Sequence, residues 1–341
     1  MELSGTILAG DDYEPLEGRV VVEDGEIAAV ERTATDSNDI VCPAFVNAHT
    51  HVGDSIAKEA GRGLSLDELV APPDGLKHRL LGEASRNEKI QAMARSLSFM
   101  EAGGTGAFLE FREGGREGVE ALAEAAADVG VEPVVFGRGG IDVLEAADGF
   151  GASGAHDDDF STARAAAREA GKPFAIHAGE VDADDIDPAM DLEPDHLVHM
   201  VHAESMHLER VEDSGTPVVV CPRSNLVTGV GLPPVPDLLE RTTVALGTDN
   251  VFLNSPSMFR EMAYTAKLFD VDAAEVLRMA TAAGAEIAGL NCGTISSGRE
   301  ARLFVLDGDS DNLAGARDPV RAVVRRASVN DVRKVHLPRR M

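Results

Sequence analysis

The sequence predicts an α/β protein: a (β/α)8 barrel of the TIM type, with a small β domain composed from both ends of the chain. Two observations predict it. Between about residue 41 and residue 250, short apolar runs typical of strands alternate with amphipathic helical patterns. The two ends of the chain show further strand-like runs, separated by turn residues.

The barrel prediction rests on eight runs. In chain order they are IVCPAFVNAHTH, TGAFLEF, EPVVFGR, DGFGASG, PFAIHAGE, DHLVHMV, PVVVCPRSN and TVALGTDN. Most are apolar throughout, as expected of parallel strands that are covered on both faces. Eight such strands with intervening helices over roughly 250 residues suit a closed barrel.

Helices are predicted between many of these runs. The segments EKIQAMARSLSFMEAG, REGVEALAEAAADVG and TARAAAREAG have a helical pattern, and each ends on glycine, which commonly terminates helices. The alternative fold is an open, doubly wound sheet. It is disfavoured because no glycine-rich phosphate-binding fingerprint follows the first run.

The ends of the chain predict the small β domain. Residues 18–31, GRVVVEDGEIAAVE, indicate two strands joined by a hairpin turn at Asp24 and Gly25. Three strand-like segments follow near the C-terminus, at residues 301–308, 320–327 and 331–337. We therefore predict a composite β domain and a hydrolase barrel. Their ranges are 1–42 with 293–341 for the β domain and 43–292 for the barrel.

The chain is strongly acidic. Its 341 residues include 59 acidic and 31 basic side chains, which gives a net charge of −28 and argues against nucleic acid as a partner. The carboxylates are spread along the chain, which favours a halophilic surface, since salt screens their repulsion. A locally basic segment near the C-terminus is interpreted as a solvated face that pairs with the acidic body. Its members are Arg317, Arg321, Arg325, Arg326, Arg333, Lys334, Arg339 and Arg340.

No feature of the sequence predicts a membrane or an export route. No run of about 18 apolar residues occurs, and the first residues, MELSGTILAGDDYEP, lack the pattern of a signal peptide. Cys42, Cys221 and Cys292 are too widely spaced for a disulfide framework or a CxxC metal knuckle. We expect a cytoplasmic protein that contacts no membrane. Its oligomeric state stays open, a homo-oligomer included.

Histidine and carboxylate side chains recur at the predicted strand ends. His49 and His51 close the first strand, and residues i and i+2 of a strand point to the same face. Taken alone, this pair also suits a polar strand end. His177, His199 and Asp249 end the fifth, sixth and eighth strands, and such ends meet at the barrel mouth. Imidazole nitrogens with one carboxylate oxygen suit Zn²⁺ or Fe²⁺, with a position open for water.

The motifs NAHTH, HAGE, HMVH and GTDN together resemble those of the metal-dependent amidohydrolase superfamily. They are similar in particular to its cytosine, adenosine and related aminohydrolases. The resemblance covers nearly the whole chain, including the tail MATAAGAEIAGLNCGTISSGREARLFVLD. It implies hydrolytic removal of an exocyclic amino group from a small purine-like, pyrimidine-like or other N-heterocyclic substrate.

The resemblance also implies a role for each site residue. The metal ligands would be His49, His51, His177 and Asp249. They would hold one divalent metal, Zn²⁺ first and Fe²⁺ as the alternative, which would lower the pKa of a bound water toward ~7. Asp249 would also take a proton from that water, and His199 would orient it. Glu180 would donate a proton to a ring nitrogen of the substrate.

One metal is expected rather than two. Relatives with two metals bridge them through a carboxylated Lys or a Glu on strand 3 or 4, and EPVVFGRGG and DGFGASG contain no Lys. The chain departs from its relatives at VVVCPRSN, which lacks the His that many of them carry at the end of strand 7. It also has Arg302 where they have Asp. The first departure leaves the substrate open.

Basic residues at the expected mouth favour a substrate with an anionic group. Arg112, Arg138 and Arg223 follow the second, third and seventh strands. Lys77 lies in PPDGLKHRLL, a segment after the first strand that could cover the mouth as a lid. Each alone suits a surface or ion-paired residue. Together they suit a phosphate or a carboxylate, which match the guanidinium fork.

Two other functions stay open at this point. One is hydrolysis of a different bond, in a cyclic amide, an imine or a chlorinated ring. The other, from a different class, is a catalytically silent barrel that acts as a binding module. The presence of Glu180 beside a complete set of ligands weighs against silence, because a scaffold does not need that acid.

Overall fold

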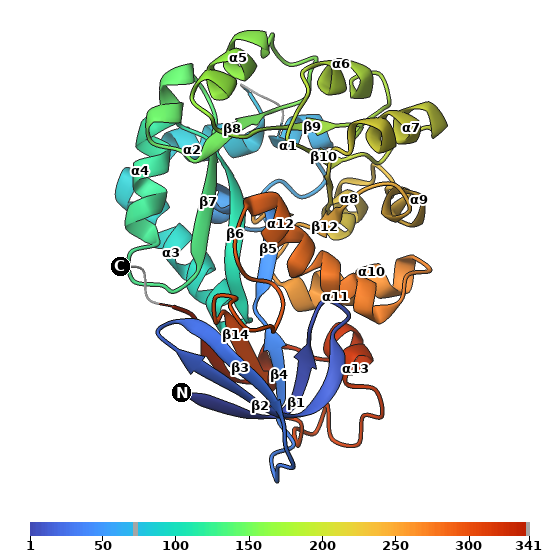
Figure 1. Cartoon of the computed structure of the whole chain (residues 1–341). Helices are drawn as coiled ribbons and strands as arrows, with labels where there is room; N and C mark the ends of the chain where they lie inside the picture. Colours follow the sequence, from blue (N-terminus) through green and yellow to red (C-terminus); the bar gives the residue numbers. More distant parts are fainter. Residues whose placement is uncertain (71–73, 339–341) are drawn as a thin grey trace.

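The computed structural model describes residues 1–70 and 74–338, which form two sheets (Figure 1). In Figure 1 the smaller sheet lies below the barrel, and it brings the blue N-terminal strands beside the red C-terminal segments. Its strand order is β15-β14-β4-β1-β2-β3. The strands are β1 (Glu2–Ala9), β2 (Glu14–Glu23), β3 (Glu26–Arg32), β4 (Ile40–Pro43), β14 (Leu303–Leu306) and β15 (Val332–His336).

The predicted hairpin is confirmed. β2 and β3 pair antiparallel, and the two residues between them, Asp24 and Gly25, have φ of 49° and 86°. Two successive residues with positive φ are the mark of the tight turn that joins twisted antiparallel strands. β4 pairs parallel with β1 and antiparallel with β14, so the strands from the two ends of the chain join in one sheet. The exact residue boundaries predicted for the two domains stay a prediction.

One strand prediction near the C-terminus is wrong. Residues 320–327 include most of a helix, α13 (Pro319–Arg325). The side chain of Asp318 caps it by accepting a hydrogen bond from the Arg321 backbone N–H, and Pro319 occupies the first turn. The buried Val residues of this segment have helical spacing, which a short apolar run does not distinguish from strand. The segment DVRKVHL, by contrast, forms β15 as predicted.

The basic segment is exposed along α13. Arg317, Arg321, Arg325 and Arg326 are exposed to solvent. Arg333 pairs with two carboxylates, at 2.8 Å from Asp39 and 2.7 Å from Asp307. Arg339 and Arg340 lie outside the described residues.

The larger sheet is the barrel, with strand order β12-β11-β10-β9-β8-β7-β6-β5-β13. The strands are β5 (Phe45–His51), β6 (Thr105–Arg112), β7 (Glu132–Gly137), β8 (Gly149–Ala152), β9 (Phe174–Ala178), β10 (His196–His199), β11 (Val218–Val220), β12 (Val244–Leu246) and β13 (Asp249–Asn250). All of its pairings are parallel.

The barrel closes through its last strand, which is divided into β12 and β13. β12 pairs with β11, β13 pairs with β5, and only Gly247 and Thr248 separate the two. Gly247 is required here because a Cβ atom would lie 2.7 Å from Cβ of His49. The predicted barrel fold is therefore confirmed. The first predicted strand is divided as well, because Ile40–Pro43 belongs to the small sheet and only Phe45–His51 to the barrel.

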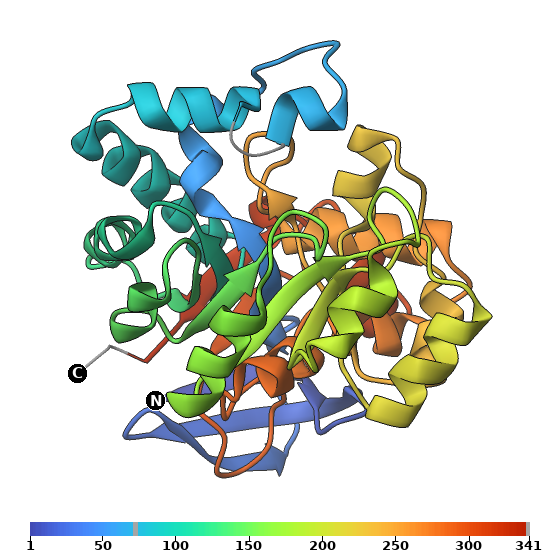
Figure 2. The same cartoon turned by 90° about the horizontal axis from the view of Figure 1, so that it is seen from above.

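Helices surround the barrel strands, as the view from above shows (Figure 2). The α-helices are α1 (Leu66–Val70), α2 (Leu76–Glu83), α3 (Arg86–Ala102), α4 (Gly115–Ala125), α5 (Ser161–Glu169), α6 (Ile186–Asp191), α7 (Ser205–Ser214), α8 (Pro222–Thr228), α9 (Val235–Leu239), α10 (Met258–Leu268), α11 (Ala273–Met279), α12 (Ala282–Ala288) and α13. The 3-10 helices are η1 (Val52–Ala57), η2 (Ile141–Glu145) and η3 (Val329–Asp331). None of the helices in the described part of the chain has the length and apolarity needed to cross a membrane.

Candidate active site

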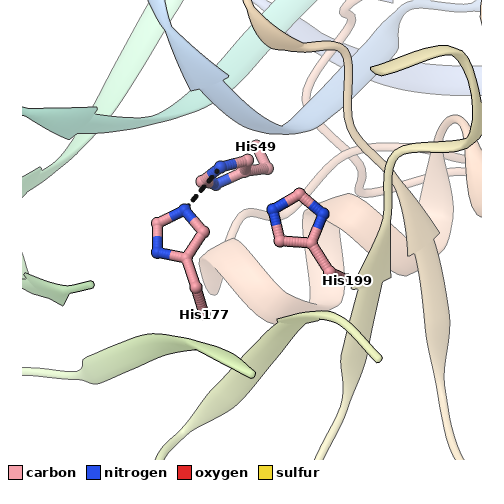
Figure 3. Close-up of side chains that lie close together, drawn as sticks. All are labelled: His49, His177 and His199. Atoms are coloured by element: carbon pink, nitrogen blue, oxygen red, sulfur yellow. Dashed lines mark hydrogen bonds between the residues drawn. The ribbon is translucent and has the colours of Figure 1, made fainter. Parts of the chain in front are cut away.

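Three histidine rings meet where barrel strands end. His49 on β5, His177 on β9 and His199 on β10 point toward one another (Figure 3). The Nε2 atoms of His49 and His177 are 3.3 Å apart, and the ring centroids of His177 and His199 are 5.4 Å apart. Strands that are distant around the barrel thus bring their side chains together at its mouth.

Asp249 and His51 complete this cluster. Oδ1 of Asp249 lies 3.4 Å from Nε2 of His49 and 3.6 Å from Nε2 of His51. Both residues are buried. Asp249 has a φ of 56°, a left-handed conformation that a non-glycine residue keeps only when its surroundings hold it.

The nitrogens of His177 and His51 that face the centre of the cluster carry lone pairs. Nδ1 of His177 donates to the carbonyl oxygen of Ala152 at 2.9 Å, so the ring proton is on Nδ1 and Nε2 has a lone pair. Nδ1 of His51 lies 3.2 Å from carboxylate Oε1 of Glu113, which favours the same tautomer. Lone pairs and a carboxylate oxygen that converge in this way fit a cation placed among them, and Nδ2 of Asn250 donates to the same oxygen, Oδ1 of Asp249, at 3.1 Å.

Burial sets the protonation states of these groups. It lowers the pKa of His49 to about 4, lowers that of His51, and lowers that of His177 well below its usual range. Burial alone would raise the pKa of Asp249. The hydrogen bond to His49 and the charges of His199, His49 and His51 outweigh burial and hold that pKa well below its usual range. Neutral imidazoles and an ionised carboxylate are the states that bind metal.

The side chains of the cluster could hold a metal ion. Within residues 1–70 and 74–338, each set of three metal-ligating side chains with ligand atoms within 4.8 Å shares a member with another such set. The sets are His49 with His177 and His199, His49 with His51 and Asp249, and Glu180 with His199 and Asp249. Imidazole and carboxylate donors of this kind suit Zn²⁺ or Fe²⁺.

Glu180 follows β9 and lies beside the cluster. Its Oε2 atom is 3.5 Å from Nε2 of His199. Burial raises the pKa of Glu180 above its usual range, and the Asp249 carboxylate adds to the rise although His199 opposes it. A carboxyl group with a raised pKa at the edge of such a site can hold a proton and donate it.

A cavity of about 260 Å³ opens over the cluster. Its wall includes His51, His177, Glu180, His199 and Asp249. The cavity therefore gives a small molecule access to the metal-ligating side chains and to the candidate acid together.

A family comparison agrees with this geometry. The model of the amidohydrolase family matches residues 40–335. The chain belongs to the amidohydrolase family. The match includes every residue of the cluster, from the first strand of the barrel to the last.

Relatives of this amidohydrolase extend the comparison. A Methanothermobacter thermautotrophicus protein, provisionally named an aminohydrolase, is 34% identical and aligns over 96% of this chain and 95% of its own length. A 5-methylthioadenosine/S-adenosylhomocysteine deaminase of Halobacterium salinarum is 30% identical, over 98% of this chain and 90% of its own length. A solved adenosine deaminase from Xanthomonas campestris with bound zinc has a TM-score of 0.77 at 19% identity, over 98% of this chain and 90% of that chain. At that identity the solved structure shows a shared fold.

Two of the four residues predicted to bind substrate, Lys77 and Arg138, line the cavity of this amidohydrolase. Both approach the same carboxylate, with Lys77 Nζ 2.9 Å and Arg138 Nη1 3.1 Å from Oε1 of Glu113. Lys77 Nζ also lies 3.3 Å from Oδ2 of Asp54. Lys77 belongs to α2, within the predicted lid. Pro72 and Pro73 of that lid lie outside the described residues.

The other two residues, Arg112 and Arg223, do not line this cavity, and their substrate role stays a prediction. The ring of Phe111 lies 4.7 Å from that of His49 inside the barrel, so the next residue, Arg112, faces outward, where its Nε donates to the carbonyl oxygen of Gly118. Arg223 lies in the first turn of α8, which turns the chain away from the strand direction. It is buried there, with Nε 2.6 Å from Oε2 of Glu261.

Four polar residues that contact the cluster were missed from sequence. Glu113 lies beside His51, Ser224 and Asn250 donate to Asp249, and Asn225 approaches His199. Their positions at or just after the ends of predicted strands offered a signal, because those strand ends share the edge that carries the ligands. Glutamate, serine and asparagine are common at strand ends, however, so residue type alone did not distinguish them.

A buried carboxylate on β6 was also missed. Glu110 accepts hydrogen bonds from Thr50 Oγ1 and from the backbone N–H of Val52, both at 2.7 Å. Burial raises the pKa of Glu110 to about 8. Because its two donors flank His51 in the chain, Glu110 fixes the end of β5 that presents this histidine.

Proposed function

We propose that this protein is a mononuclear metal-dependent aminohydrolase. It removes the exocyclic amino group of a purine-like, pyrimidine-like or other N-heterocyclic small molecule by hydrolysis. The observation that carries the proposal is the pairing of two features at one cavity: converging lone pairs that fit a metal, and Glu180, a carboxyl group with a raised pKa, beside them. The aminohydrolase and deaminase names of the relatives support the same chemistry.

The metal would be Zn²⁺ first, with Fe²⁺ as the alternative, and one ion would occupy the site. Its ligands would be His49, His51, His177 and Asp249. When bound, the ion lowers the pKa of a water molecule toward ~7, so that hydroxide is present at neutral pH. The zinc in the Xanthomonas campestris structure supports the choice of metal.

The side chains of the chain supply the proton transfers. Asp249, held ionised, accepts a proton from the attacking water. His199, 3.5 Å from Glu180, orients that water. Glu180 donates its proton to a ring nitrogen, which makes the neighbouring ring carbon electrophilic. A carbon–oxygen bond then forms at that carbon, the amino nitrogen takes up the proton held by Asp249, and its bond to the carbon breaks so that it leaves as ammonia. The remaining proton of the added hydroxyl goes to Glu180 as the carbonyl forms, which restores the acid.

The experiment that tests this proposal is ammonia release from a panel of aminopurines, aminopyrimidines, nucleosides, nucleotides and pterins. We expect at least one of these compounds to release one ammonia per molecule consumed, in a reaction that stops when the metal is chelated. Chloride release or ring opening without ammonia would assign a different hydrolytic reaction. Binding of a panel compound without turnover by metal-loaded protein would assign a silent binding module.

We also infer that the substrate carries an anionic group. Lys77 and Arg138 at the cavity wall support this, since they are basic residues at the mouth of a protein with a net charge of −28. Glu113 already lies beside both, so an anionic group would share these cations with it. Arg138→Ala should raise KM for an anionic substrate about tenfold, on the order of 1.4 kcal/mol, and leave KM for its neutral analogue unchanged. An equal effect on both compounds would contradict the inference.

We propose, finally, that the surface is adapted to high salt. Asp157, Asp158 and Asp159 are consecutive and all exposed, which illustrates how closely like charges are placed. Such placement costs free energy that mobile cations reduce. The cytoplasmic location stays a prediction from the cysteines, which are free and buried in the structure.

A further inference from the structure

The segment Arg223–Ser224–Asn225 follows β11 and has neither a histidine nor a carboxylate. β11 lies between β10, which ends on His199, and β12, which leads to Asp249. All three side chains of the segment are buried, and those of Ser224 and Asn225 are fully so. The segment is thus placed between the two side chains that the proposed function assigns to the attacking water.

Ser224 fixes the orientation of the Asp249 carboxylate. Its Oγ donates a hydrogen bond to Oδ2 of Asp249 at 2.5 Å. The other oxygen, Oδ1, is the one that faces His49 and His51. Nδ2 of Asn250 also donates to Oδ1, at 3.1 Å, so the carboxylate is held at both oxygens. It cannot rotate without losing the bond from Ser224, which keeps Oδ2 turned away from the cluster.

Asn225 fixes the tautomer of His199. Its Nδ2 atom lies 3.3 Å from Nδ1 of His199. An amide nitrogen only donates, so Nδ1 of the ring is the acceptor and the ring proton is on Nε2. Nε2 is the atom that lies 3.5 Å from Oε2 of Glu180 at the cavity. Asn225 therefore directs a proton of His199 toward the place where water and Glu180 meet.

Both held residues have unfavourable backbone conformations. His199 has a φ of 83° and Asp249 a φ of 56°. A left-handed conformation at a residue with a Cβ atom is strained and persists only where surrounding contacts fix it. Side-chain contacts from the segment between them are such constraints, and they act on both strand ends together.

Arg223 anchors the segment itself. Its backbone N–H donates to Oε1 of Glu261 at 3.0 Å, and its Nε donates to Oε2 of the same carboxylate at 2.6 Å. Its Nη2 donates to the carbonyl oxygen of Ser255 at 2.8 Å. Glu261 lies on α10, so the start of the segment is tied to a helix outside the barrel. A buried ion pair, joined by a backbone hydrogen bond to the second oxygen of the same carboxylate, gives the segment a fixed geometry.

We propose that Arg223–Ser224–Asn225 is a positioning segment, in which Ser224 aligns Asp249 for proton acceptance, Asn225 selects the Nε2–H tautomer of His199, and Arg223 anchors both. The three are positioning residues, since they act through Asp249 and His199 rather than on the substrate. The role in turnover rests on the proposed function. The hydrogen bonds and the tautomer are properties of the fold and can be measured separately.

The first test compares Ser224→Thr with Ser224→Val. The two side chains have nearly the same shape, so a role in packing alone would change both variants equally. If the hydroxyl aligns Asp249, Ser224→Thr should exceed Ser224→Val in kcat by at least ~10-fold, with similar KM, metal content and melting temperature. Equal kcat in the two metal-loaded variants would overturn the role of Ser224.

The second test concerns the tautomer of His199. In zinc-loaded protein labelled with ¹⁵N-histidine, long-range proton–nitrogen NMR correlations should show a protonated Nε2 and an unprotonated Nδ1 for His199. His199→Gln identifies the signals by their loss. In Asn225→Asp the new carboxylate accepts from Nδ1, so the ring proton should move to Nδ1 and kcat should fall at least ~10-fold. A protonated Nδ1 in the unmodified protein, or full kcat in Asn225→Asp, would overturn the role of Asn225.

The proposed function and the proposed positioning role of the segment can fail separately. If the protein releases no ammonia from any compound, the proposed function fails, while the NMR result still decides the tautomer. If ammonia is released but the ring proton lies on Nδ1, the deaminase proposal stands and the positioning role of Asn225 is wrong.

Discussion

Both sides of the barrel mouth carry polar residues near strand ends, but the two sides differ in chemistry. On one side, His49, His177 and Asp249 lie on barrel strands, and their nitrogen and carboxylate ligand atoms converge. On the other side, Lys77 and Arg138 contact Glu113, and each cation there has an anion beside it. Both sides consist of polar residues at or just beyond strand ends, so the sequence alone does not distinguish them.

This difference indicates how a ligand-binding site can be distinguished from polar groups that only support the fold. Polar groups that pair with one another keep their geometry without a ligand, even where a ligand can share them, and their removal is expected to reduce stability first. Polar groups of one kind that converge in a buried place need a ligand to be satisfied, and their removal is expected to reduce binding and catalysis first. The predictions below test this contrast.

The largest effect is expected on the metal side. His177→Ala and Asp249→Ala should each lose the metal and lower kcat/KM by more than about a thousandfold, because each removes a ligand that also sets the charge of the site. Metal content and ammonia release are measured on the same samples. His336→Ala, in β15 of the small sheet, is the matched control and should keep both. Full metal content with full activity in either variant would remove that residue from the ligand set.

Substitution of Glu180, the proposed acid, should impair catalysis without loss of the metal. Glu180→Gln keeps the shape of the side chain but cannot donate the proton, so kcat should fall by ~10²–10⁴ while metal content is unchanged. Turnover and metal content per chain are the measurements. Unchanged turnover in metal-replete Glu180→Gln would rule out its role as the acid.

On the ion-pair side, stability should change first. Glu113→Gln leaves the buried ammonium of Lys77 and the guanidinium of Arg138 short of an anion, which should lower the free energy of unfolding by about 3 kcal/mol. Glu120→Gln is the matched control, since its pair with Arg116 is exposed and should contribute less than about 1 kcal/mol. Denaturant unfolding of the metal-free proteins measures both. Equal losses in the free energy of unfolding for the two variants would show that the ion pairs of Glu113 with Lys77 and Arg138 do not stabilise the fold.

The smallest effect is expected for the acidic outer surface, which lies outside the barrel mouth. If the acidic excess is a high-salt adaptation, the melting temperature should rise by several degrees between about 0.1 M and about 2 M KCl, because salt screens the self-repulsion. A second series in sucrose controls for excluded-volume effects. A flat or falling melting temperature would contradict the halophilic prediction.

The sequence predicted the barrel and the histidine cluster because both depend on local patterns. Apolar runs mark the strands, and strand ends in a parallel barrel share one edge, so His49 and Asp249 could be placed together across 200 residues. The alternation within a strand could also have placed Arg112 outside, one residue after the inward Phe111. That argument needs the direction of one neighbouring side chain, which the structure supplies through its ring contact with His49.

Other features depend on tertiary packing and left no local signal. Arg223 follows a strand as the site residues do, and only the approach of Glu261 from α10 reveals it as an anchor. The helix at Pro319–Arg325 has the apolar content of a strand, and its burial against the rest of the fold decides its conformation. The break between β4 and β5 could be predicted only with the knowledge that the two parts of this run belong to different sheets.

The central claim is that the converging lone pairs hold one metal ion that supports deamination. The most direct test is to add Zn²⁺ in steps to metal-free protein and to measure ammonia release from the best substrate of the panel. The account predicts that activity rises linearly and reaches its plateau at one equivalent of zinc per chain. A plateau at two equivalents, or ammonia release at full rate from metal-free protein, would contradict it.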